Sequence, residues 1–120
     1  PEQILAHYRQ AIDDERVRVE TRNLSFSGVS SAVSSTASPL FGQLTQTIKQ
    51  TFPEALVAPS LVLAATDSRH YEGLSENIYR FQPLYLTAED LDRLHGHNER
   101  ISAAAYLKSI GFFEQFLVNL

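Results

Sequence analysis

The sequence predicts an α/β fold, because segments with helical periodicity are followed by short apolar or alternating runs that are typical of strands. The elements form two groups. A serine-rich stretch separates one helix and one strand from a longer series of helix, strand, strand, helix and helix. At 120 residues, the chain is long enough for one domain with a modest core.

The first group opens the chain. Residues 1–14 (PEQILAHYRQAIDD) are predicted to form a helix, because an apolar stripe recurs at helical spacing along Ile4, Leu5, Tyr8 and Ile12. Residues 16–27 then alternate, with Val17 and Val19 on one face and charged side chains on the other, which predicts a half-buried strand. Each element has a single apolar face, so the pair requires further elements to cover it.

Residues 27–38 (SGVSSAVSSTAS) are rich in serine and alanine and have no periodicity, which predicts a linker or a long loop. Composition leaves two interpretations open, because a surface loop within one domain and a crossover between two domains have the same character.

The second group begins with a helix. Ser38 and Pro39 are typical of a helix start, and Pro53 ends the apolar stripe that follows them. Residues 60–65 (SLVLAA) form an apolar run that predicts a buried strand, and residues 77–83 (NIYRFQP) predict a second one.

Two helices are predicted to complete the chain. Thr87 and Asp90 have the spacing of a capping box, and Gly96 is placed to end the helix that they begin. Ser102 is predicted to cap a last helix, whose apolar side would consist of Leu107, Ile110, Phe113, Leu117 and Leu120.

Composition excludes several classes of function. The net charge is −4 and there is no basic run, so a nucleic-acid partner has little support, because binding to phosphates requires clustered Lys and Arg. No stretch approaches the roughly 20 apolar residues needed to span a bilayer. The absence of cysteine excludes disulfides, cysteine-ligated zinc and thiol catalysis in this chain, and it leaves the compartment open.

Residues 66–71 (TDSRHY) are the first candidate for chemistry, because they follow the predicted strand at 60–65. In open α/β sheets, ligands bind outside the carboxyl ends of the strands. Arg69 offers a planar fork of donors for a carboxylate, and Asp67 is placed to orient it. The alternative is a surface loop with a local Asp–Arg ion pair.

Residues 94–102 (LHGHNERIS) are the second candidate, because His95 and His97 flank a glycine and Glu99 follows. A metal-binding histidine requires a fixed neutral imidazole, which a carboxylate often orients. A zinc site needs three or four ligands, so the alternative is a pair of solvated histidines at a helix end.

Residues 66–102 (TDSRHYEGLSENIYRFQPLYLTAEDLDRLHGHNERIS) resemble the carboxy-terminal signature of the zinc-dependent carboxypeptidase S and N-acyl-amino-acid amidohydrolase family, which is related to aminoacylase and glutamate carboxypeptidase. Residues 1–20 resemble the last helix and strand of that family's inserted lid domain. Residues 38–61 resemble the return into its catalytic domain. The resemblance covers nearly the whole chain, but only the carboxy-terminal part of the family's enzymes.

The resemblance implies a division of the chain. Residues 1–26 would be the end of an α+β lid or dimerisation domain, residues 27–37 a serine-rich crossover, and residues 38–120 the carboxy-terminal part of a zinc-peptidase catalytic domain. The chain would then be a carboxy-terminal fragment of an α/β enzyme.

The resemblance also implies roles for individual residues. His95 matches a zinc ligand of the family, Glu99 matches a supporting glutamate, and His97 falls on a variable position. Arg69 matches the arginine expected to hold the free carboxylate of the substrate, beside Thr66 and Asp67. The sequence departs from the family at Ala64-Ala65, where the family has a glycine pair, and two methyl groups there would narrow the pocket.

The implied parent enzyme uses two zinc ions to hydrolyse a peptide or N-acyl amide bond next to a free carboxylate. Its other metal ligands and its general base would lie upstream, so no catalytic residue is expected in this chain. The 120 residues alone are expected to be inactive and to self-associate through exposed apolar faces. A non-catalytic binding module and a proteolytic fragment are the alternatives. A His-x-Asp motif and a Glu-Glu pair upstream would favour the enzyme.

Overall fold

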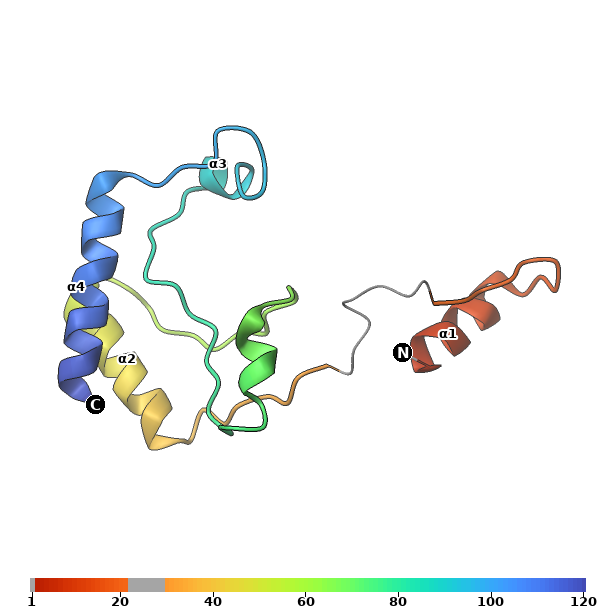
Figure 1. Ribbon diagram of the computed structural model, residues 1–120, viewed down its shortest axis with the longest axis horizontal. Coiled ribbons are helices and arrows are strands. Elements are labelled where there is room, and N and C mark those ends of the chain that lie inside the picture. Colours follow the sequence, from red (N-terminus) through yellow and green to blue (C-terminus); the bar gives the residue numbers. More distant parts are fainter. Residues whose placement is uncertain (1, 22–29) are drawn as a thin grey trace.

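The computed structural model describes residues 2–21 and 30–120. In these residues the chain forms helices and no β-strand. The helices are, in chain order, α1 (Glu2–Ile12), α2 (Pro39–Thr51), the 3-10 helix η1 (Asp67–Tyr71), α3 (Ala88–Leu91) and α4 (Ala103–Asn119) (Figure 1). Within the same residues, none of the helices has the length and apolar character that crossing a membrane requires.

Helices α2 and α4 form the core of the molecule and lie side by side (Figure 1). They are the only pair of helices in contact within the described residues. The buried apolar side chains come from α2, the residue after it and α4, and they are Leu44, Ile48, Phe52 and Phe112. Burial of each of these side chains stabilises the fold by about 1.5–3 kcal/mol.

Phe112 lies at the centre of this core and is 2% exposed. Its ring is stacked on Phe116 at a centroid distance of 6.0 Å and lies 5.2 Å from Phe81 and 6.4 Å from Phe52. Phe81 comes from the segment between η1 and α3, so this ring connects that segment to the helix pair.

The starts of α2 and α4 confirm the capping residues expected from the sequence. The hydroxyl of Ser38 accepts a hydrogen bond from the N–H of Leu40, and Pro39 follows as the first helical residue. The hydroxyl of Ser102 accepts from the N–H of Ala105. These bonds satisfy N–H groups that have no partner inside the helix.

A buried polar contact fixes the register of the two helices. Thr47 on α2 is 0% exposed, and its hydroxyl accepts a 2.7 Å hydrogen bond from the side-chain amide of Asn119 on α4. The same amide donates to Gln50, and the carbonyl of Asn119 accepts from Gln43. Since a buried polar group without a partner is costly, sliding one helix along the other would break several bonds at once.

The α/β fold is not confirmed, because none of the predicted strands forms within the described residues. Residues 60–65 were expected to be buried, yet Leu63 is 97% exposed and Leu61 is exposed as well. Residues 77–83 are irregular, although part of this segment is half-buried. A strand is stabilised by hydrogen bonds to a neighbouring strand, and the apolar pattern alone cannot supply one.

The serine-rich crossover is described from residue 30 onward, and hydrogen bonds tie it to a distant segment. The hydroxyl of Ser34 accepts from the N–H of Ile78 at 2.8 Å and donates to the carbonyl of the same residue at 3.1 Å. The hydroxyl of Tyr79 donates to the carbonyl of Ser35 at 2.7 Å. Composition predicted a linker or a long loop, and the described part of this segment forms hydrogen bonds to residues 44 positions further along the chain.

The first segment forms the expected helix and no strand within its described part. Helix α1 ends at Ile12, and Asp13 follows with a left-handed φ of 46°. The Arg9 guanidinium donates to the carbonyl of Val19 at 3.1 Å, which folds residues 17–19 back toward the helix. Residues 22–27 of the predicted strand lie outside the described residues. The assignment of residues 1–26 to a lid domain stays a prediction.

The chain is open for its length. Its radius of gyration is 19.1 Å, whereas a compact domain of this size has about 14 Å. The predicted apolar side of α4 is wrong, because its five residues are exposed and Phe112 is buried in their place; the five are Leu107, Ile110, Phe113, Leu117 and Leu120. Self-association through this face stays a prediction, which sedimentation at rising concentration would measure.

Replacing Phe112 by Ala is expected to lower the free energy of unfolding by about 3–5 kcal/mol, because the cavity would open among aromatic rings that cannot all close over it. The matched control is Phe113→Ala, one residue further along α4 and 51% exposed, for which a loss of about 1 kcal/mol is expected. Urea denaturation of both variants measures the difference. Equal losses would contradict the placement of the core.

Candidate functional site

An apolar cleft with a volume of about 1030 Å³ lies between the crossover, α2 and the two irregular segments around η1. Its walls include residues 55–66 and 78–85. Among the predicted site residues, Thr66 and Arg69 line this cleft together with Arg80. The structure therefore places two of the three expected carboxylate-binding residues on the wall of an apolar cleft, whereas Asp67 does not line it.

Thr66 comes directly before η1 and has an extended backbone, with φ −141° and ψ 162°. Its side chain does not cap the helix. Instead, its hydroxyl shares a 2.5 Å hydrogen bond with the hydroxyl of Ser68 and accepts from the Nε of Arg80 at 3.3 Å. These contacts join the first turn of η1 to the segment that follows it.

Arg69 is exposed on η1, and its Nε donates to Nε2 of His70 at 3.4 Å. Asp67 is the first residue of the same helix and is exposed too. The alanine pair at 64–65 also lines the cleft. Arg69 thus combines access to solvent with a place on the cleft wall, which is what a guanidinium needs to bind an entering carboxylate.

The second candidate segment is a turn after α3. The helix was expected to end at Gly96, but α3 ends at Leu91, and in the turn that follows it is His95 that has a left-handed φ of 58°. Histidine tolerates this region better than most residues. Gly96 has a different task, because a Cβ there would lie 3.3 Å from the carbonyl oxygen of Asp92. Glycine at this position therefore lets the backbone of the turn pack closely against the carbonyl group of Asp92, just after His95.

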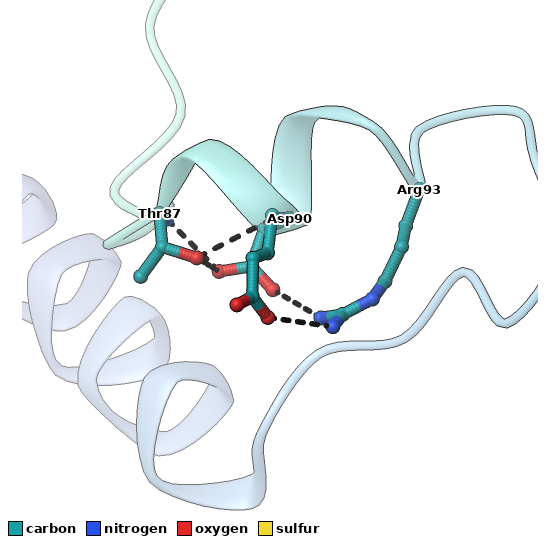
Figure 2. A network of polar contacts seen from close by, with 4 residues as sticks. Thr87, Asp90 and Arg93 are labelled. Carbon is teal, nitrogen blue, oxygen red and sulfur yellow. Dashed lines mark hydrogen bonds and ion pairs between the residues drawn. The ribbon is translucent and has the colours of Figure 1, made fainter.

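A cluster of polar contacts holds the base of this turn (Figure 2). The predicted capping box is confirmed, because the Asp90 carboxylate accepts from the N–H of Thr87 at 2.9 Å and from its hydroxyl at 2.7 Å. Arg93 donates to Asp90 at 2.9 Å and to Glu89 at 3.1 Å. The hydrogen bonds from Thr87, followed by the charge of Arg93, hold the pKa of the Asp90 carboxyl below its usual range.

His95, the predicted zinc ligand, is not part of a complete metal site in the described residues. His95, His97 and Glu99 are all exposed. No group of three or more potential ligands is close enough to hold a metal ion within residues 2–21 and 30–120. His95 is also not among the residues that line the cleft. Figure 1 shows η1 and the turn after α3 in separate parts of the molecule. The two candidate sites are not brought together by this chain.

Several known proteins are similar to this chain over most of its length. The chain is 40% identical over 116 residues to the probable carboxypeptidase S-like 2 of Dictyostelium discoideum, which covers 97% of this chain and 22% of that protein. It is 39% identical over 119 residues to the N-fatty-acyl-amino acid synthase/hydrolase PM20D1 of Xenopus tropicalis, which covers 98% and 23%. This chain belongs to the family of carboxypeptidase S and the N-acyl-amino-acid hydrolases.

The match to this family is partial in length. The human PM20D1 protein is 42% identical over 77 residues, or 63% of this chain and 15% of the human protein. The chain spans about a fifth of the length of the curated relatives it matches. No protein-family profile and no solved structure matches it.

Sequence reasoning missed Arg80, although this residue lies within residues 66–102, the segment whose resemblance to the family was noted from the sequence. Its Nε donates to Ser68 at 2.7 Å, and its Nη2 donates to Ser31 at 3.0 Å. The only signal in the sequence is an arginine between two aromatic residues, Tyr79 and Phe81. In an alternating pattern, such an arginine is expected on the polar face of a strand, and the pattern predicts no function for it.

Because the pKa of Asp90 is lowered in the folded protein, its ionised form stabilises the turn above the ordinary aspartate pKa of about 3.9, and the stabilisation is lost as the pH falls through the lower folded value. Asp90→Asn is therefore expected to reduce the amide protection of residues 88–96 at pH 7, and this reduction should shrink as the pH falls below the ordinary aspartate pKa. Hydrogen exchange measures this. The control is Asp92→Asn, an exposed carboxyl of the same turn. A loss of protection in Asp90→Asn that is independent of pH would contradict the role of the charge.

Proposed function

We propose that this chain is the carboxy-terminal part of a hydrolase that cleaves a peptide or N-acyl amide bond next to a free carboxylate. The observation that supports the proposal most is Arg69, an exposed guanidinium on the wall of an apolar cleft, in a chain of the carboxypeptidase S family. Arg69 would hold the carboxylate of the substrate, and Thr66 and Asp67 would lie beside it. The cleft would receive the apolar part.

The proposed cofactor of the whole enzyme is zinc, with His95 as one ligand and Glu99 as its supporting carboxylate. When bound, zinc supplies Lewis-acid chemistry at the scissile carbonyl. The described residues hold no complete ligand set, so the remaining ligands and the general base would come from outside this chain. The 120 residues are accordingly expected to be inactive alone. Their partner would be the upstream half of the catalytic domain.

A binding module without catalysis is the second candidate. One observation favours it, because Ala64 and Ala65 line the cleft where the family has a glycine pair. Their methyl groups occupy space that a glycine backbone would leave to the ligand. A His-x-Asp motif and a Glu-Glu pair upstream would decide for the enzyme.

Replacing Arg69 by Ala or Lys in the full-length protein is expected to weaken hydrolysis of substrates with a free carboxylate. The loss in transition-state stabilisation should be about 2–5 kcal/mol for Ala, because the carboxylate stays desolvated without its partner. Lys should restore little, since one ammonium cannot bind both carboxylate oxygens in the way a guanidinium does. Steady-state kinetics on the acid and on the matching amide measure kcat/KM for both.

The amide substrate is the control for this experiment. It has no carboxylate to lose, so the full-length protein should hydrolyse it poorly and the variants should change it little. If Arg69 only pairs with a neighbouring carboxylate such as Glu72, its loss lowers stability and leaves the acid-to-amide ratio of kcat/KM unchanged. An unchanged ratio would contradict the proposed role of Arg69 in binding the substrate carboxylate.

The metal proposal predicts unequal roles for the two histidines. In the full-length protein, His95→Ala is expected to abolish most of the activity, whereas His97→Ala should be nearly neutral. Because His95 has a left-handed backbone, the pair His95→Asn and His97→Asn repeats the comparison with a residue that tolerates this conformation. Turnover and zinc content are measured for all variants. Equal losses would point to a His-x-His site instead.

The isolated chain gives a further check on the metal proposal. It is expected to bind zinc weakly, since it would supply one of the four or so ligands that a zinc ion requires. Isothermal titration of the 120-residue chain with zinc measures the affinity. Tight one-to-one binding would show that this chain forms a site of its own, and the proposed sharing of ligands with an upstream half would be wrong.

A further inference from the structure

We propose that Arg80 is a positioning residue that fixes the first turn of η1, and with it Arg69, against the wall of the cleft. The inference rests on the proposed role of Arg69 as the carboxylate-binding residue. It adds to that role a second arginine, which acts through hydrogen bonds to hydroxyl groups and not through contact with the substrate.

The contacts of Arg80 connect three separate segments. Its Nε donates to the hydroxyls of Ser68 at 2.7 Å and Thr66 at 3.3 Å, on either side of the start of η1. Its Nη2 donates to the hydroxyl of Ser31 in the crossover at 3.0 Å. One rigid guanidinium therefore sets the distance between η1 and the crossover, because its donors diverge in a fixed plane.

The partners of Arg80 are unusual for a half-buried cation. Within the described residues, no carboxylate lies within ion-pair distance of Arg80, and its hydrogen-bond acceptors are the neutral hydroxyls of Ser31, Thr66 and Ser68. A carboxylate here would form a stronger pair, but it would also neutralise a positive charge on the wall that Arg69 shares. The hydroxyls hold the guanidinium in place and leave the cleft wall positive.

Helix η1 needs such a tether. It spans Asp67–Tyr71 and has no buried residue, and in the part of the chain that the structure describes it contacts no other helix. A short 3-10 helix of this kind has weak hydrogen-bond geometry of its own. Ser68 is the residue directly before Arg69. The hydrogen bond from Arg80 to Ser68 therefore acts one residue away from the proposed carboxylate-binding residue.

The test uses the full-length protein with Ser68→Ala, Arg80→Lys and the double variant. Ser68→Ala removes one bond with little risk to folding, and Arg80→Lys keeps the charge but loses the planar fork. The matched control is Ser35→Ala, also in the crossover, whose hydroxyl accepts from the N–H of Ala37. The measurements are the acid-to-amide ratio of kcat/KM and hydrogen exchange of the peptide that contains η1.

Ser68→Ala and Arg80→Lys are each expected to lower the acid-to-amide ratio about tenfold, through KM on the acid, because a displaced clamp loses a charge-assisted contact. The double variant should lose little more than either single one, since both remove the same bond. Exchange in η1 should rise in both variants. Ser35→Ala should leave the ratio and the exchange unchanged.

The outcomes separate this inference from the proposed function. If Arg69→Ala lowers the ratio while Ser68→Ala and Arg80→Lys do not, the proposed function stands and the positioning role is overturned. If Arg69→Ala leaves the ratio unchanged, the proposed carboxylate-binding role of Arg69 is wrong. The hydrogen-exchange measurement alone then decides whether Arg80 holds η1 in place. Unchanged exchange in both variants overturns the tether in either case.

Discussion

The phenyl ring of Phe112 contacts Phe52 at the end of α2, Phe81 in the segment after η1, and Phe116 one turn further along α4. Through Phe81, this ring fixes the segment that also includes Arg80. Arg80 in turn reaches η1 and the crossover. The position of the cleft wall therefore depends on an aromatic contact that lies inside the helix pair and touches none of the proposed site residues.

The sequence predicted where three helices begin, but it did not predict the end of α3, the buried side of α4 or the absence of strands in the described residues. The start of α2 at Ser38, the capping box at Thr87 and the start of α4 at Ser102 were all confirmed, because a helix and its caps are made by residues close together in the sequence. The pattern at residues 60–65 is equally clear, but a strand requires a neighbouring strand, and residues 2–21 and 30–120 contain none.

For the candidate site, motifs identified the residues but could not place them. Thr66, Asp67 and Arg69 were predicted as one group; Thr66 and Arg69 line one cleft, whereas Asp67 does not. The metal-binding role of His95 stays a prediction. Arg80 was missed because its partners lie 12, 14 and 49 residues away and have no common periodicity. Hydroxyl groups that bind one guanidinium from such distant positions produce no recognisable pattern in a single sequence.

The double hydrogen bond between Ser34 and Ile78 has a consequence for the handling of the protein. The serine hydroxyl occupies both backbone groups that an intruding strand would use, so this stretch is protected from templated β-pairing. In the part of the chain that the structure describes, residues 60–65 have no comparable side-chain hydrogen bonds to their backbone, and they are apolar, uncharged, free of proline and exposed. Such segments nucleate amyloid-like stacking. Precipitates of the chain in concentrated stocks are therefore expected to grow from this hexapeptide, and a single lysine within it should act as a gatekeeper.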